Sequence, residues 1–140
     1  MKNVVQKIIA AGVVIYDNKV LIVQRAADEE ILPNLWEFPS GKREPLEESV
    51  TTVKREVKEE TGIEVEVVSI ISVFEFKVEK PDEIRDLTQI NFLVKPVATP
   101  EVKLSSEHQN FAWVGEDELG NYNLSEEVKA VMKKAFGFHL

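Results

Sequence analysis

The chain has 140 residues, of which 44% are hydrophobic and 30% are charged, and it carries a net charge of −8. This length and composition are those of one soluble globular domain, so we expect residues 1–140 to form a single domain. The sequence has no cysteine, which excludes disulfides and cysteine nucleophiles, and its acidity argues against stable binding to a nucleic-acid backbone.

The N-terminal region is predicted to be a β-hairpin. Residues 8–16 and 19–26 are rich in β-branched side chains, and they flank the turn pair Asp17-Asn18. The apolar run is interrupted there, well short of the about 20 residues that a membrane-spanning helix needs. We therefore expect no membrane association and a cytoplasmic location. The hairpin is followed by a loop and a short extended segment, 36–40.

Two helices are indicated by apolar periodicity and by capping residues. The first has apolar side chains three or four residues apart at Leu46, Val50, Val53 and Val57. We predict that this helix begins at Leu46, just after Pro45, and that it buries this stripe. Gly62 is predicted to end it as a C-terminal cap. The second helix is predicted over 126–136, with Ser125 as its N-cap.

Three further segments have the β-branched and aromatic content of strands, and a charged turn separates the first two. The strands are predicted over 63–79, 87–98 and 110–114, and the turn over 80–86. The sequence contains no internal repeat or low-complexity tract. The order of hairpin, short strand, helix, strands and helix predicts an α+β fold in which helices pack on a mixed β-sheet.

The first predicted helix concentrates negative charge on one sector. At about 100° per residue, Glu60 lies about 40° to one side of Glu56, and Glu59 lies about 60° to the other. The i,i+4 pair of like charges destabilises an exposed helix by about 0.2–0.5 kcal/mol. A solvated acidic face is one interpretation. The other is a site for a hard divalent cation such as Mg²⁺, which binds carboxylate oxygens.

A longer pattern distinguishes these interpretations. It reads Gly, five residues, Glu, seven residues, then Arg-Glu-aliphatic-any-Glu-Glu-any-Gly-aliphatic. The matching residues are Gly41, Glu47, Arg55, Glu56, Val57, Glu59, Glu60, Gly62 and Ile63. This stretch resembles the Nudix box, the sequence signature of the Nudix (MutT-like) hydrolases, and nine matches in a fixed frame are highly specific. The flanking segments "LWEFPSG" and "SSEHQNFAWV" are also similar to the family, although Ser40 stands where many members have glycine.

The resemblance implies an α/β/α sandwich with a mixed sheet between helices, and a loop–helix–loop that binds Mg²⁺ or Mn²⁺. Glu56 and Glu60 match the family's metal-binding glutamates, and the backbone carbonyl of Gly41 matches a further ligand. Glu59 matches a position that binds metal or assists the attacking water, depending on the member.

The resemblance also implies roles for residues around the acidic cluster. Arg55 would orient the cluster, and Glu47 would tie the loop to the helix through Arg55, while Gly62 would be structural. Glu107 is the best candidate for a general base outside the box, and the alternative is a solvated loop acid. His108 is expected to make an ordinary hydrogen bond rather than to act as the base.

Four residues are candidates for substrate contacts. Arg25 could bind a phosphate through its forked donors or pair with a surface acid. Trp36, Phe38 and Trp113 could stack on a nucleobase, although core packing is the more common role of such side chains.

The resulting hypothesis is a Mg²⁺-dependent pyrophosphohydrolase that acts on a nucleoside diphosphate linked to another group. The preferred substrate class is a small-molecule nucleoside triphosphate, canonical in its base or modified, which would give the monophosphate and pyrophosphate. ADP-ribose, other nucleotide sugars and dinucleoside polyphosphates are alternatives. A non-catalytic nucleotide-binding module is another. Many family members are homodimers, but no feature of this sequence marks an interface.

Overall fold

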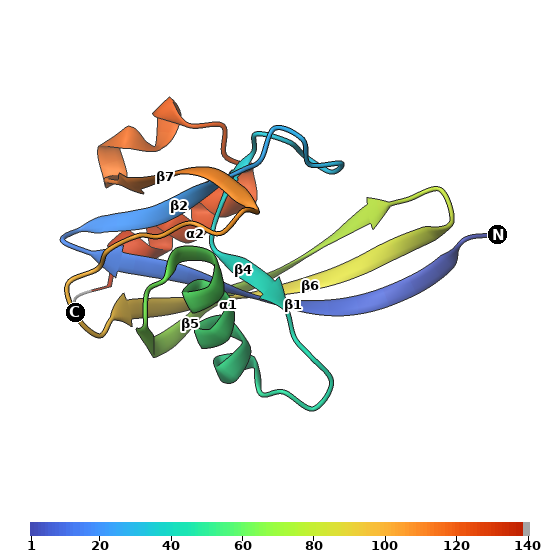
Figure 1. Cartoon of the computed structure of the whole chain (residues 1–140), viewed down its shortest axis with the longest axis horizontal. Helices are drawn as coiled ribbons and strands as arrows, with labels where there is room; N and C mark the ends of the chain where they lie inside the picture. Colours follow the sequence, from blue (N-terminus) through green and yellow to red (C-terminus); the bar gives the residue numbers. More distant parts are fainter. Residues whose placement is uncertain (139–140) are drawn as a thin grey trace.

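The computed structural model describes residues 1–138 (Figure 1). A seven-stranded mixed sheet has the order β3-β2-β1-β6-β5, with β4 paired to β1 and β7 paired to β2. Only β1 and β6 are parallel among the paired strands of this region. The elements are β1 (Asn3–Tyr16), β2 (Lys19–Arg25), β3 (Trp36–Glu37), β4 (Ser40–Lys42), α1 (Ser49–Thr61), β5 (Val65–Glu79), β6 (Glu83–Pro96), β7 (His108–Val114), the 3₁₀ helix η1 (Glu116–Asn121) and α2 (Glu126–Phe136).

The central strand β1 supplies side chains to both faces of the sheet. Successive residues of a strand point to opposite faces, so Ala10 and Val14 lie in the core cluster that contains α1. Ala11 and Val13 lie in the cluster that contains α2. The two helices therefore cover opposite faces, which confirms the predicted α/β/α sandwich. No helix within residues 1–138 has the length and apolar character needed to cross a membrane.

The predicted hairpin and strands are confirmed. Asp17 and Asn18 have φ angles of 52° and 58°, as a type I′ turn requires. The predicted turn over 80–86 is shorter than expected, because β6 already begins at Glu83. Pairing with β5 and with the start of β1 continues through this region. These three strands extend away from the helices as a three-stranded arm (Figure 1).

The predicted start of the first helix is wrong. Helix α1 begins at Ser49 rather than at Leu46, which is 98% exposed and has a φ angle of 66°. Val50 is also exposed, so only Val53 and Val57 of the expected stripe are buried. The chain before the helix instead forms a tight turn, which gives the Glu47 carboxylate a position beside the helix rather than on it.

The predicted helix caps agree with the structure. Gly62 has a left-handed φ of 76°, and its N–H donates to the Lys58 carbonyl at 2.8 Å. This is the conformation that favours glycine after a helix. At the start of α2, the Ser125 hydroxyl accepts a hydrogen bond from the Val128 N–H at 3.2 Å, which satisfies one free donor of the first turn.

Strands β4 and β2 both pair with β1, but at different positions along it, and this leaves an opening between them. Strand β4 pairs with β1 at residues 9–11, whereas β2 pairs with it at residues 15–16. Between these pairings, the Gly12 N–H donates to the carbonyl of Pro39, just before β4. The C-terminal end of β2 and the start of β7 consequently lie across an opening from β4.

Gly12 allows α1 to pack closely on the sheet. A Cβ at this position would lie 2.5 Å from Val57 Cγ2 and 3.3 Å from Val53 Cγ2. Because both neighbours are buried and β-branched, neither can move easily. We expect Gly12→Ala to lower the free energy of unfolding by about 1–3 kcal/mol, as measured by denaturant unfolding.

Gly120→Ala is the matched control, because a Cβ there would meet nothing within 4 Å. Equal stability of the two variants would contradict the close packing of α1 on β1.

Candidate active site

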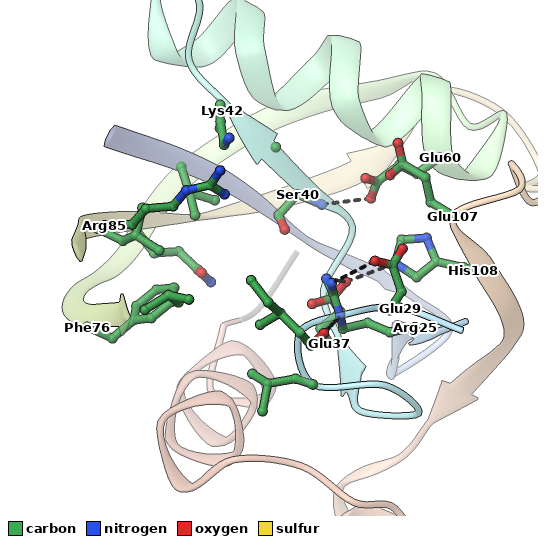
Figure 2. A pocket seen from close by; sticks show the side chains of 17 residues that line it. Arg25, Glu29, Glu37, Ser40, Lys42, Glu60, Phe76, Arg85, Glu107 and His108 are labelled. Carbon is green, nitrogen blue, oxygen red and sulfur yellow. Dashed lines mark hydrogen bonds and ion pairs between the residues drawn. The ribbon is translucent and has the colours of Figure 1, made fainter. Parts of the chain in front are cut away.

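A pocket lies between β4, the end of α1, the start of β7 and the arm (Figure 2). Glu60 and Glu107 form one part of its wall, and the charged residues Arg25, Lys42 and Arg85 lie elsewhere around it. The walls between them include apolar side chains of the arm. The pocket thus combines carboxylates, cations and apolar surface within one opening, a combination typical of a small-molecule site.

Arg55 holds the acids of α1 and the preceding turn together. Its Nε and Nη2 donate to the two Glu47 carboxylate oxygens at 2.9 and 3.0 Å, and its Nη1 donates to Glu56 at 2.7 Å. Hydrogen bonds from Arg55, from the Thr52 hydroxyl and from the Glu44 N–H lower the pKa of Glu47 to about 2. Glu47 is therefore a permanent anion that fixes the Arg55 guanidinium in place.

Glu56 and Gly41 lie against each other. A Cβ added at Gly41 would overlap the Glu56 carboxylate, so glycine is needed for the backbone of β4 to approach α1 so closely. The Glu56 side chain is only 15% exposed. Burial raises its pKa, although the Arg55 guanidinium opposes this shift.

Glu60 is the most deeply buried acid of the site, with 5% exposure. Its Oε1 accepts a hydrogen bond from the Ser40 N–H at 2.9 Å. Burial raises its pKa to about 9, with the negative charge of Glu107 as an additional cause. Single ligand atoms of Glu60, Glu107 and His108 all lie within 4.8 Å of one another. Within residues 1–138, no Lys or Arg forms an ion pair with Glu60.

Glu59 differs from the other two acids of the helix. Its side chain is 58% exposed, and it accepts a longer bond of 3.4 Å from Arg55 Nη1. The helical projection predicts that the three acids share one sector of α1, but they differ in solvent exposure. Glu60 faces the protein interior, Glu56 lies at the boundary, and Glu59 lies near solvent.

Arg25 and His108 are directly opposite each other in the β2–β7 pairing. The Arg25 guanidinium donates to Glu29 at 3.3 Å and to Glu37 at 3.5 Å, and its Nε donates to the Ile31 carbonyl at 3.0 Å. Its donors are thus largely occupied by acceptors in the loop before β3 and by Glu37 of β3. His108 is buried, with Nε2 2.9 Å from Glu37 Oε2. Its Nδ1 has no hydrogen-bond partner within the described chain.

Two of the three aromatic candidates lie in the core, and the third packs against it. Phe38 is 1% exposed and Trp36 is 9% exposed, and Trp36 makes an edge-on contact with Tyr122. Trp113 packs beside Tyr16 on the other side of the sheet, against the α1 cluster. None of these three side chains lines the pocket that contains Glu60. Core packing, the alternative role considered for them, describes their environment.

Four charged residues of the pocket were not found by sequence analysis: Glu29, Glu37, Lys42 and Arg85. Glu37 had a detectable signal, because it is a lone acid between two core aromatics, Trp36 and Phe38. Lys42 directly follows the first glycine of the box. Arg85 had no local signal, since it belongs to a charged segment that was interpreted as a solvent-exposed turn.

Comparison with known proteins identifies the family. The protein-family model described as the NUDIX domain matches residues 6–136 of the sequence, so the chain belongs to the Nudix family. The mouse (Mus musculus) bis(5'-nucleosyl)-tetraphosphatase, asymmetrical, is 32% identical over 104 residues, covering 74% of this chain and 71% of the relative. Nucleoside triphosphatase NudI from Klebsiella pneumoniae (strain 342) is 24% identical over 136 residues, covering 92% and 96%.

Similar solved structures have the same fold. The MutT protein from Methanosarcina mazei Go1 has a TM-score of 0.73 and 26% identity, and the match covers 96% of this chain and 94% of that one. Family, fold and hydrolase class are therefore as the box predicted.

Gly41→Ala tests the contact between β4 and α1. The new methyl group would displace the Glu56 carboxylate, which ends a flexible side chain and can move at little cost to the fold. We expect turnover to fall at least about tenfold, as removal of a well-placed contact of about 1.4 kcal/mol would produce. The melting temperature should fall less than in Gly12→Ala. Turnover within twofold of the wild type would contradict this arrangement.

Glu60→Gln tests the energetic cost of the buried acid. The pKa of Glu60 is raised from 4.5 to about 9, so between these pH values the unfolded chain releases this proton and the folded chain retains it. The stability of the metal-free protein therefore falls as pH rises through this window. Gln removes the penalty and retains an oxygen for the Ser40 N–H. We expect the melting temperature in EDTA to rise by about 4 °C or more at pH 8, and by less at pH 5.

The control for this change is Glu59→Gln, since the Glu59 side chain is 58% exposed and its neutralisation should alter stability little. A Glu60→Gln protein that melts below the wild type at pH 8 would show that burial of this carboxylate carries no net cost.

Proposed function

We propose that this Nudix hydrolase is a Mg²⁺-dependent pyrophosphohydrolase whose preferred substrates are nucleoside triphosphates. Water would attack a phosphorus of the phosphoanhydride and the bridging P–O bond would break. The products would be the nucleoside monophosphate and pyrophosphate, and the proton of the water would pass to a carboxylate and then to solvent. The observation that carries this proposal is the buried Glu60 carboxylate, grouped with Glu107 and close to the Glu56–Gly41 contact.

The residues present fit a hard divalent cation. Carboxylate and carbonyl oxygens are the donors that Mg²⁺ prefers, and Glu56, Glu60 and the Gly41 carbonyl would provide them. A buried carboxylate with a raised pKa and no ion pair is stabilised by a cation. Such an ion, when bound, neutralises phosphate charge and makes water a better nucleophile.

The remaining residues would hold the Glu56 carboxylate in position and accept the proton of the attacking water. Arg55, held by Glu47, keeps the Glu56 carboxylate fixed and directed toward β4. Glu107 would accept the proton of the attacking water, because it is an exposed carboxylate at the rim of the acidic group and can exchange that proton with solvent. Glu59 would support the cation from the solvent side.

Relatives of this chain support the substrate class. One is named a nucleoside triphosphatase and matches along almost its whole length. Dinucleoside polyphosphates are the second candidate class, because the mouse bis(5'-nucleosyl)-tetraphosphatase has the higher identity, 32%. Both classes present a chain of several phosphates to the site.

The proposal is tested by phosphate release from a nucleotide panel with Mg²⁺ and a coupling pyrophosphatase or phosphatase. The panel would contain canonical and oxidised triphosphates, ADP-ribose, sugar nucleotides and dinucleoside polyphosphates. We expect triphosphates to be turned over best. Glu56→Gln should reduce turnover by about 100-fold or more, since it removes an anionic ligand. EDTA should abolish turnover while circular dichroism shows an intact fold.

Turnover that persists in EDTA, or that survives Glu56→Gln, would contradict the mechanism. Nucleotide binding without turnover of any panel member would favour a non-catalytic binding module instead.

A further inference from the structure

Two cations lie at the end of the pocket that is remote from the carboxylates. Figure 2 shows the Lys42 ammonium and the Arg85 guanidinium near each other, across the pocket from Glu60, Glu107 and His108. The two residues belong to β4 and β6, which are not neighbours in the sheet. Strand β1 lies between them, so their side chains meet above the face of the sheet.

The strand register explains why they meet. Lys42 is opposite Ile9 of β1, and Ile9 is opposite Gln89 of β6. Arg85 is four residues before Gln89, so its side chain has the same orientation as that of Gln89. Residues at these positions line the pocket. Lys42 and Arg85 therefore extend over one face of the sheet and converge there.

Positive charge is concentrated at this end of an acidic protein. The positively charged groups of Arg85, Lys7 and Lys80 are close enough to repel the Lys42 ammonium, and Glu83 is an acid close enough to attract it. Within residues 1–138, Lys42 forms no ion pair, and Arg85 pairs only with Glu83, at 2.9 Å. Cations that repel one another in this way are stabilised by a bound anion.

The cations lie in line with the acidic group along β4. The Ser40 N–H bonds Glu60, and Lys42 follows Ser40 by two residues on the same side of the strand, about 7 Å farther along. A chain of phosphates that begins at the carboxylates would therefore reach Lys42 after its first members. Arg25 does not compete for this role, because Glu29, Glu37 and the Ile31 carbonyl occupy its donors.

We propose that Lys42 and Arg85 form an anion subsite for the phosphates beyond the first two of the substrate. The subsite would favour nucleotides with three or more consecutive phosphates over nucleotides that carry a neutral sugar on the second phosphate. This inference rests on the proposed function and specifies its substrate class. Substrates would be selected by the length of their phosphate chain, because a neutral sugar has no negative charge to bind the two cations.

Binding of inert phosphate chains tests the subsite without turnover. We would measure, by calorimetry with Mg²⁺, the affinities of methylene-bridged analogues of pyrophosphate and tripolyphosphate. The wild type should bind the longer analogue more tightly. The double variant Lys42→Gln, Arg85→Gln should lose about tenfold or more in affinity for the longer analogue and change less than about twofold for the shorter one.

One further variant controls for net charge, and another tests the ion pair of Arg85. Lys77→Gln, Lys95→Gln removes the same charge from exposed residues that do not line the pocket, and it should leave both affinities unchanged. Glu83→Gln frees Arg85 from its ion pair, and it should tighten binding of the longer analogue.

The outcomes separate the two proposals. Equal losses for both analogues, or no loss for either, would overturn the subsite, as would an equal effect of the Lys77–Lys95 control. Selective loss for the longer analogue supports the subsite even if the nucleotide panel shows no turnover, and in that case only the proposed function fails.

Discussion

The approach of a buried carboxylate to the backbone of β4 is the constraint on which the rest of the site depends. Glu60 is almost fully buried, and the Ser40 N–H donates to it. One turn earlier, Glu56 lies so close to Gly41 that no side chain fits between them. Acids in this environment raise the free energy of the folded protein unless a cation compensates them. The buried acids of this site therefore lower the free energy of unfolding.

Two glycines and one arginine make this arrangement stable. Gly12 lets α1 approach the sheet, and Gly41 lets β4 approach α1, so the helix is held between two close contacts. Arg55 connects the helix to the Glu47 carboxylate outside it, and no Lys or Arg within residues 1–138 forms an ion pair with the buried Glu60. The Arg55 guanidinium thus fixes the positions of Glu47 and Glu56 and does not neutralise Glu60. The Glu60 carboxylate is therefore free to interact with a ligand.

The pocket separates its charges along one direction. Carboxylates gather where α1, β4 and the start of β7 meet, and the cations Lys42 and Arg85 lie toward the arm (Figure 2). In the proposed function, such a gradient would orient an elongated anionic ligand, because a cation bound at the acids and the side chains of Lys42 and Arg85 would attract different parts of it. The arm contributes little to the core, but its side chains form one wall of the pocket.

The sequence by itself determined the features that depend on near neighbours in the chain: the Asp17-Asn18 turn, the Gly62 and Ser125 caps, and the acids of α1, which helical periodicity places together. It also determined the family, through the fixed spacing of the box. Tertiary structure decided the rest. The helix starts at Ser49 because Glu47 makes bonds to Arg55 and Thr52 that a continuing helix would not permit. Burial assigned different environments to Glu56, Glu59 and Glu60, and the register of strands distant in sequence brought Lys42 and Arg85 together, since only pairing across the sheet specifies which side chains meet.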